Sequence, residues 1–193
     1  MSDPGSSEVI IGVTGHRILD NPKPIISGVD RALHAIKTSF DAGRLVILSP
    51  LAEGADRIVA NRALAIAGIK LIAILPLPVE MYQEDFQSSS SRKEFHDLLQ
   101  LADEVIELPR TIKREESYRN AGEYLVAKSD VLIAIWDGLP TRGPGGTAEV
   151  VALAREKNLP LAWIYTRPDV SQHKKTVFPD LNHGDVYFER FPE

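Results

Sequence analysis

A glycine-rich stretch in the second half of the chain, residues 137–149, has the composition of a phosphate-binding loop. It follows six apolar residues, 131–136, that are typical of a strand buried on both faces, and a helical pattern resumes after it. Glycines without a Cβ let backbone N–H groups approach an anion, and the first turn of a helix adds unpaired donors and a positive dipole end. We therefore predict a phosphate cradle at Gly145, Gly146 and Thr147, to which Gly15 also donates, with Asp137 and Gly138 as further ligand-binding candidates.

Two other polar turns follow apolar strands, one at 14–17 and one at 49–57. The carboxyl ends of parallel strands meet at one edge of a sheet, so we expect these turns and the glycine-rich stretch to line one site. There the planar guanidinium of Arg17 would pair with a phosphate, and Glu53 and Glu149 would accept ribose hydroxyls. The two turns contribute the candidates Thr14, Gly15, His16, Arg17, Ser49, Glu53, Gly54 and Asp56.

Purely structural roles remain open for several of these residues. Gly15 and Gly54 are compatible with simple turn positions, and Arg17 is compatible with a solvated ion pair. His16 suits either a packing role or a ligand contact. Asp56 stands where a helix favours a negative charge in its first turn, and this role is favoured over a catalytic one.

Three aromatic residues near the predicted site, Tyr118, Tyr124 and Trp136, have rings that can stack on a base. For Trp136 a core position is favoured, because strands buried on both faces are apolar. The serine-rich segment 87–92 is expected to be an exposed, mobile loop, with a lid over the site as an alternative. The identity of the base does not follow from these residues.

The elements that must position the turns alternate between strands and helices. Strand patterns fall at 9–13, 45–48, 70–75, 104–108, 131–136 and 161–165, with helical patterns between them and a short strand expected at 186–188. Such alternation implies right-handed crossovers and a parallel sheet covered on both faces. The predicted fold is therefore α/β, a Rossmann-like doubly wound three-layer sandwich with a mainly parallel sheet.

The chain of 193 residues, 44% of them hydrophobic, is long enough to bury one full core. We expect a disordered lead-in at 1–8, a Rossmann-like domain at 9–166 and a C-terminal wrap of the same domain at 167–193. Its apolar runs are shorter than the roughly 20 residues that a membrane-spanning helix needs, and the N-terminus lacks the layout of a secretory signal. These features predict a cytoplasmic protein without a membrane partner.

Charge and residue usage exclude several kinds of site. The sequence has no cysteine, which removes disulfides and thiolate chemistry, and its five histidines show no metal-ligand spacing. The net charge of −5 disfavours nucleic acid as a partner, because nonspecific affinity comes from clustered Lys and Arg. Neither a metal nor another cofactor is expected, and the remaining candidate is a small anionic ligand bound by helix dipoles and one or two arginines.

Four motifs together resemble the SLOG superfamily, named for the SMF/DprA and LOG (Lonely Guy) proteins. They are Gly12-Val13-Thr14-Gly15-His16-Arg17, Leu51-Ala52-Glu53-Gly54-Ala55-Asp56, Ser129-Asp130-Val131-Leu132-Ile133-Ala134 and Gly145-Gly146-Thr147-Ala148-Glu149. The resemblance covers residues 9 to about 165. It implies a Rossmann-like fold that binds a nucleotide or a nucleotide-derived ligand, and a homodimer or higher homo-oligomer, for which the apolar helix around Tyr124 to Val126 is a candidate interface.

The LOG branch of this superfamily cleaves the N-glycosidic bond of nucleoside 5′-monophosphates and carries a Pro-Gly-Gly-x-Gly-Thr-x-x-Glu type of loop. The corresponding stretch here, Pro144 to Glu149, is shorter, with the glutamate two residues after Thr147. The arginine and lysine pair of that branch falls on Ala121 and Gly122, with Arg119 and Asn120 just before. A binding or sensing module is therefore favoured, with a phosphoribohydrolase using Glu149 and Arg119 as the alternative and a DprA-like nucleic-acid role as the least favoured.

Overall fold

The computed structural model describes residues 7–140, 145–168, 178 and 180–192. In this part of the chain seven strands form one sheet in the order β4-β3-β2-β1-β5-β6-β7, and every neighbouring pair is parallel except β6 and β7. The predicted α/β fold with a mainly parallel sheet is confirmed. The strands are β1 (Ser7–Gly15), β2 (Ala42–Ser49), β3 (Lys70–Leu75), β4 (Glu104–Glu107), β5 (Val131–Trp136), β6 (Leu161–Tyr165) and β7 (Val186–Glu189).

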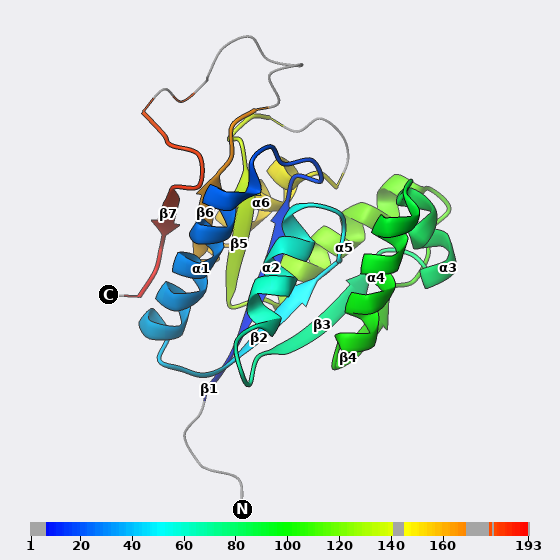
Figure 1. Cartoon of the computed structure of the whole chain (residues 1–193), viewed down its shortest axis with the longest axis horizontal. Coiled ribbons are helices and arrows are strands. Elements are labelled where there is room, and N and C mark those ends of the chain that lie inside the picture. Colours follow the sequence, from blue (N-terminus) through cyan, green and yellow to red (C-terminus); the bar gives the residue numbers. More distant parts are fainter. Residues whose placement is uncertain (1–6, 141–144, 169–177, 179, 193) are drawn as a thin grey trace, which may run out of the picture.

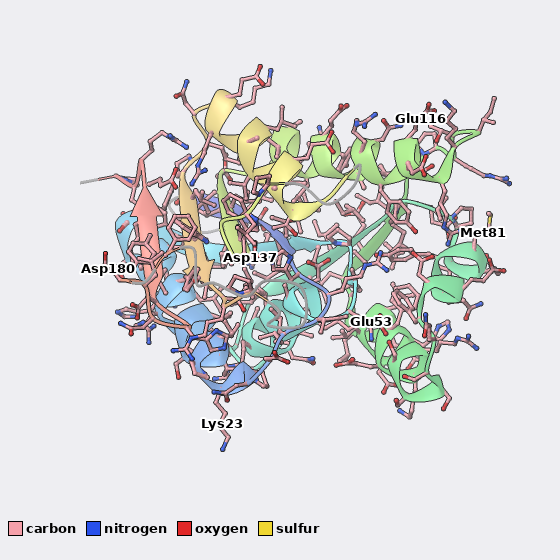
Figure 2. The ribbon with its side chains drawn as sticks, turned by 90° about the horizontal axis from the view of Figure 1, so that it is seen from above. Lys23, Glu53, Met81, Glu116, Asp137 and Asp180 are labelled. Carbon is pink, nitrogen blue, oxygen red and sulfur yellow. The ribbon has the colours of Figure 1, made fainter. Side chains whose placement is uncertain are left out.

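Helices cover both faces of the sheet and give the three predicted layers (Figures 1 and 2). Helices α1 and α2 pack on one face and α5 and α6 on the other, each pair closing its own apolar cluster with the sheet. None of the described helices is long and apolar enough to cross a membrane. The helices are α1 (Pro22–Ser39), α2 (Ala55–Leu64), α3 (Val79–Tyr82), the 3-10 turn η1 (Gln83–Asp85), α4 (Ser89–Leu101), α5 (Arg114–Lys128) and α6 (Thr147–Glu156).

The central strand β5 contributes side chains to both apolar clusters. Its odd-numbered residues, such as Ile133, lie in the cluster that includes α1 and α2, whereas its even-numbered residues, such as Leu132, lie in the cluster that includes α5 and α6. All six residues of β5 are buried. This double burial explains why the strand is a continuous apolar run instead of an alternating pattern.

The order of the strands reverses at β1, which has β2 on one side and β5 on the other. Gly15, the last residue of β1, pairs with Ile135 of β5. In doubly wound sheets the crevice outside the carboxyl ends of the strands at this point is where ligands bind. The turns after β1, β2 and β5 therefore surround the topological switch point.

The serine-rich segment is mostly exposed, as predicted, but the predicted loop was wrong. It is not a loop, because Ser88 is the N-cap of α4 and its hydroxyl accepts a hydrogen bond from the amide of Ser91 at 3.0 Å. Serine favours this position, and Phe95 and Leu98 further along bury the helix against the core. One boundary also differs, since β1 begins at Ser7, inside the expected lead-in.

Candidate functional site at the carboxyl edge of the sheet

A cavity of about 290 Å³ opens at the switch point between β1 and β5. Its walls come from the end of β1, the turns after β2 and β3, one face of α5, and the loop and first turn around the start of α6. The three predicted turns thus converge on one hollow. The predicted binding residues that line it are Thr14, Gly15, His16, Arg17, Asp56, Gly145, Gly146 and Thr147.

The first turn is held rigidly between β5 and α2. The amide of His16 donates to the carbonyl of Ile135 at 3.1 Å, and the carbonyl of His16 accepts from the amide of Ala55 at 3.1 Å. A Cβ on Gly15 would lie 2.7 Å from the carbonyl oxygen of Ile135 and would also overlap the methyl group of Ala55. Only glycine therefore lets the sheet and α2 approach this closely at the floor of the cavity.

Asp137 supports the site from behind the cavity wall. It is buried, and its Oδ1 accepts a hydrogen bond from the amide of Leu139 at 3.0 Å, which closes the turn after β5. The same oxygen lies 3.1 Å from Nε2 of His16. Figure 2 looks onto this edge and places Asp137 between the two helical layers. Asp137 thus orients His16, which itself lines the cavity.

The second turn contributes shape more than ligand contacts. The hydroxyl of Ser49 accepts from the amide of Leu51 at 3.1 Å, and Gly54, at φ +77°, packs against the carbonyl oxygens of His16 and Arg17. The carboxylate of Glu53 accepts a hydrogen bond from the hydroxyl of Ser91 in α4, and Glu53 is not among the residues that line the cavity. Ser49, Glu53 and Gly54 therefore do not line the cavity.

Asp56 forms part of the wall that α2 contributes. Only 4% of the residue is exposed, although it lines the cavity, and its Oδ2 accepts a hydrogen bond from the amide of Ala52 at 3.1 Å. Burial raises the pKa of Asp56 to about 7, against the opposing effects of the Ala52 amide and of the positive charges of Arg17 and Arg57. Asp56 thus has the predicted place in the first turn of α2 and also lines the cavity.

The third turn carries the features of an anion site. Gly146 is the N-cap of α6, and no group among the described residues accepts a hydrogen bond from the amides of Gly146, Thr147 or Ala148. Gly145 adopts φ +70°, and a Cβ there would lie 2.8 Å from Cβ of Tyr118. Gly143 and Pro144 of the predicted loop lie outside the described residues, and Gly138 does not line the cavity.

The two predicted catalytic residues lie outside this cavity. Glu149 pairs with Arg119 at 2.9 Å and accepts from the amide of Gly145 at 2.6 Å, and both contacts lower the pKa of its carboxyl, the amide more than the arginine. Val150 occupies the cavity wall instead, because successive residues of a helix are rotated by about 100°. Asn120 is exposed and does not line the cavity.

A polar cluster beside the cavity was not predicted. Asp85 of η1 accepts hydrogen bonds from Arg114 and from the hydroxyl of Tyr118, and its Oδ2 lies 3.5 Å from the guanidinium of Arg17. Tyr82 and Tyr118 also line the cavity. Arg17 and Tyr118 were among the sequence candidates, whereas Asp85, Arg114 and Tyr82 come from segments whose local patterns carry no signal of a site, and only the fold brings them together. No group of three potential metal ligands is found within the described residues.

No model of a known protein family matches this chain. The chain is 26% identical over 159 residues to a UPF0398 protein from Bacillus cereus strain G9842, covering 77% of this chain and 83% of that protein. Among solved structures it is similar to the Moco carrier protein from Chlamydomonas reinhardtii, with a TM-score of 0.46, 22% sequence identity, and coverage of 88% of this chain and 87% of that chain. The ligand class must therefore be argued from the cavity itself.

Proposed function

We propose that the protein binds a nucleotide or a related phosphorylated small molecule in this cavity, as a binding or sensing module. The observation that carries the proposal is that Arg17 and the residues at the start of α6, whose amides have no acceptor among the described residues, line one hollow. Backbone amides at a helix N-terminus and a planar guanidinium are suited to phosphate oxygens. A volume of about 290 Å³ is at the small end of ligand sites, so a mononucleotide fits better than a dinucleotide.

We further infer that the chain is a divergent SLOG protein. This inference is supported by where the motifs of the resemblance lie, since three of the four are at the edge of the sheet where they would enclose a ligand. Gly12–Arg17 ends β1, Leu51–Asp56 leads into α2, and Gly145–Glu149 starts α6. The similarity to the UPF0398 protein and to the Moco carrier protein is compatible with this inference, although neither name states the superfamily.

Binding without turnover is favoured over N-glycosidic cleavage. Cleavage would need charge stabilisation at an oxocarbenium-like centre beside the sugar. The carboxylate of Glu149 lies outside the cavity and is held by Arg119 and the Gly145 amide. An apolar side chain, Val150, lines the wall at the next position of the helix.

Isothermal titration calorimetry with inorganic phosphate and a panel of nucleoside 5′-monophosphates tests this function. The wild-type protein is expected to bind at least one nucleotide saturably, while liquid chromatography detects no free base. Arg17→Ala is expected to weaken binding by about tenfold or more. Gly146→Val is expected to abolish it, because the new side chain fills the cradle at a backbone conformation, φ −76°, that valine tolerates.

Arg119→Ala is the matched control, since this arginine lies outside the main cavity and its loss is expected to leave the affinity unchanged. Absence of saturable binding by any nucleotide, or equal affinity of wild type and Gly146→Val, would overturn the proposed function. Release of free base that Glu149→Gln abolishes would restore the hydrolase alternative.

A further inference from the structure

Asp56 is a buried carboxyl group with spare hydrogen-bonding capacity at the cavity wall. Its Oδ2 accepts one bond, from the Ala52 amide, and within the described residues Asp56 has no ion pair and no donor to its other oxygen. The neighbouring guanidinium of Arg57 is directed elsewhere, to the carbonyl of Leu51 and to Ser91 and Glu94 in α4. The other oxygen is not among the buried atoms that lack a partner, and Asp56 lines the cavity, so this oxygen is accessible to a ligand that supplies N–H donors.

The position of Asp56 separates it from the phosphate cradle. Asp56 belongs to the first turn of α2, which packs on one face of the sheet, whereas Thr147 begins α6 on the other face. Both residues line the same cavity, so they lie on its opposite walls. A ligand whose phosphate contacts the start of α6 therefore extends its far end towards Asp56.

Two aromatic side chains that touch each other line the cavity between its two walls. Tyr118 lies beside Gly145 at the start of α6, and Tyr82, whose ring is 6.3 Å from that of Tyr118 between centroids, is close enough to Asp56 for the carboxylate to raise the pKa of its hydroxyl. Burial raises the pKa of Asp56 to about 7 despite the Ala52 amide and the positive charges of Arg17 and Arg57, so near neutral pH the carboxyl is poised between its neutral and ionised forms. A heterocycle with N–H groups facing the carboxylate would restore the hydrogen bonds that burial removes.

We propose that Asp56 reads a ring edge with two adjacent N–H donors, the 2-amino-4-oxopyrimidine edge of guanine. This inference rests on the proposed nucleotide-binding function and names its base. A carboxylate is acceptor-only, so it pairs with the N1–H and 2-amino groups of guanine. Adenine and cytosine place a ring nitrogen acceptor beside their amino group, which would face the second oxygen of the carboxylate and repel it.

The test compares wild-type affinities for GMP, IMP and AMP by calorimetry at pH 8, where Asp56 is ionised. IMP lacks only the 2-amino group, so GMP is expected to bind about 10- to 100-fold more tightly than IMP or AMP. Asp56→Asn replaces one acceptor by a donor. This variant is expected to lower the affinity for GMP by a similar factor. It is also expected to raise the affinity for XMP, whose 2-oxo group accepts a hydrogen bond from the asparagine amide. Asp30→Asn, on an exposed carboxylate of α1, is the control.

Pterins carry the same edge, so 6-hydroxymethylpterin is titrated alongside the nucleotides. If Asp56→Asn weakens the binding of GMP or of the pterin but not that of AMP, the inference is supported. Whichever of the two ligands binds more tightly shows whether the ring belongs to a nucleotide or to a pterin. Equal wild-type affinity for GMP and AMP would overturn the inference while leaving nucleotide binding intact. Failure of the wild type to bind any nucleotide, phosphate or pterin would overturn both. The wild-type comparison needs no variant, so poor folding of Asp56→Asn cannot obscure the result.

Discussion

The carboxylate of Glu149 accepts a hydrogen bond from the backbone amide of Gly145 at 2.6 Å, which ties the first turn of α6 back onto the loop before it. Arg119 of α5 approaches the same carboxylate at 2.9 Å. One amide of the glycine-rich turn is thus used inside the protein, while those of Gly146 and Thr147 have no acceptor among the described residues. The glutamate therefore shapes the cradle from outside.

This relationship predicts that Glu149→Gln leaves ligand affinity within about twofold of wild type, because the amide oxygen of glutamine still accepts from Gly145. Glu149→Ala removes the acceptor and is expected to lower the free energy of unfolding by about 0.5 to 1 kcal/mol, as for other charges at a helix N-terminus. Calorimetry and urea denaturation give the two quantities. A tenfold loss of affinity in Glu149→Gln, with unchanged stability, would show instead that the carboxylate touches the ligand.

The fold could be predicted because each strand carries its own signal. Residues 131–136 are apolar on both faces, and the polar turns at 14–17, 49–57 and 137–149 follow strands, so their shared edge comes directly from a parallel topology. The serine-rich segment was predicted as a loop because serine is common both in loops and at helix N-caps. Its helical character depends on Phe95 and Leu98, which bury against the core.

The site could be predicted only in part. Residue type placed Arg17 and Asp56 in the right turns, but it could not tell that Asp56 is buried or that Glu149 is rotated out of the cavity. The glutamate and Val150 differ by one position on a helix, so an error of one residue in the register changes which side chain lines the wall. Asp85 and Arg114 meet only through tertiary packing.

A second prediction concerns two arginines of the same helix, Arg57 and Arg62. Arg57 is 3% exposed, donates to the carbonyls of Leu51 and Ser91 and to the carboxylate of Glu94, and stacks with its guanidinium carbon 4.5 Å from the ring centroid of Phe86. Arg57→Ala would leave buried carbonyls without donors and open a cavity between α2 and α4. We expect a loss of about 3 kcal/mol in the free energy of unfolding.

Arg62→Ala is the control for this prediction. Arg62 makes a bidentate pair with Asp30 at 2.8 and 2.9 Å, but both side chains are nearly half exposed. Such pairs contribute about 0 to 1 kcal/mol. Urea denaturation of both variants gives the comparison, and equal losses would mean that burial of Arg57 does not determine its contribution.

The third prediction concerns the dependence of stability on pH, which follows from Asp56. Its pKa in the folded protein is about 7, against a reference value of 3.8, because burial outweighs the opposing effects of the Ala52 amide, Arg17 and Arg57. Tyr82 also faces this carboxyl. Below pH 4 both states hold the proton, and between pH 4 and pH 7 only the folded state does. Unfolding then releases a proton, so the contribution to stability falls as pH rises to 7 and is level above it.

We therefore expect that the free energy of unfolding of Asp56→Asn does not fall in this way between pH 4 and pH 7. At pH 8 the variant is expected to be more stable than the wild type. The asparagine oxygen can still accept from the amide of Ala52, and a neutral side chain avoids the cost of burying a charge. The difference between the two proteins should grow by about 2 to 4 kcal/mol between pH 4 and pH 7. Urea denaturation at pH 4, 6 and 8 measures it. A constant difference across this range would mean that Asp56 has the same proton affinity folded and unfolded, and its carboxyl would then be solvated through the open cavity.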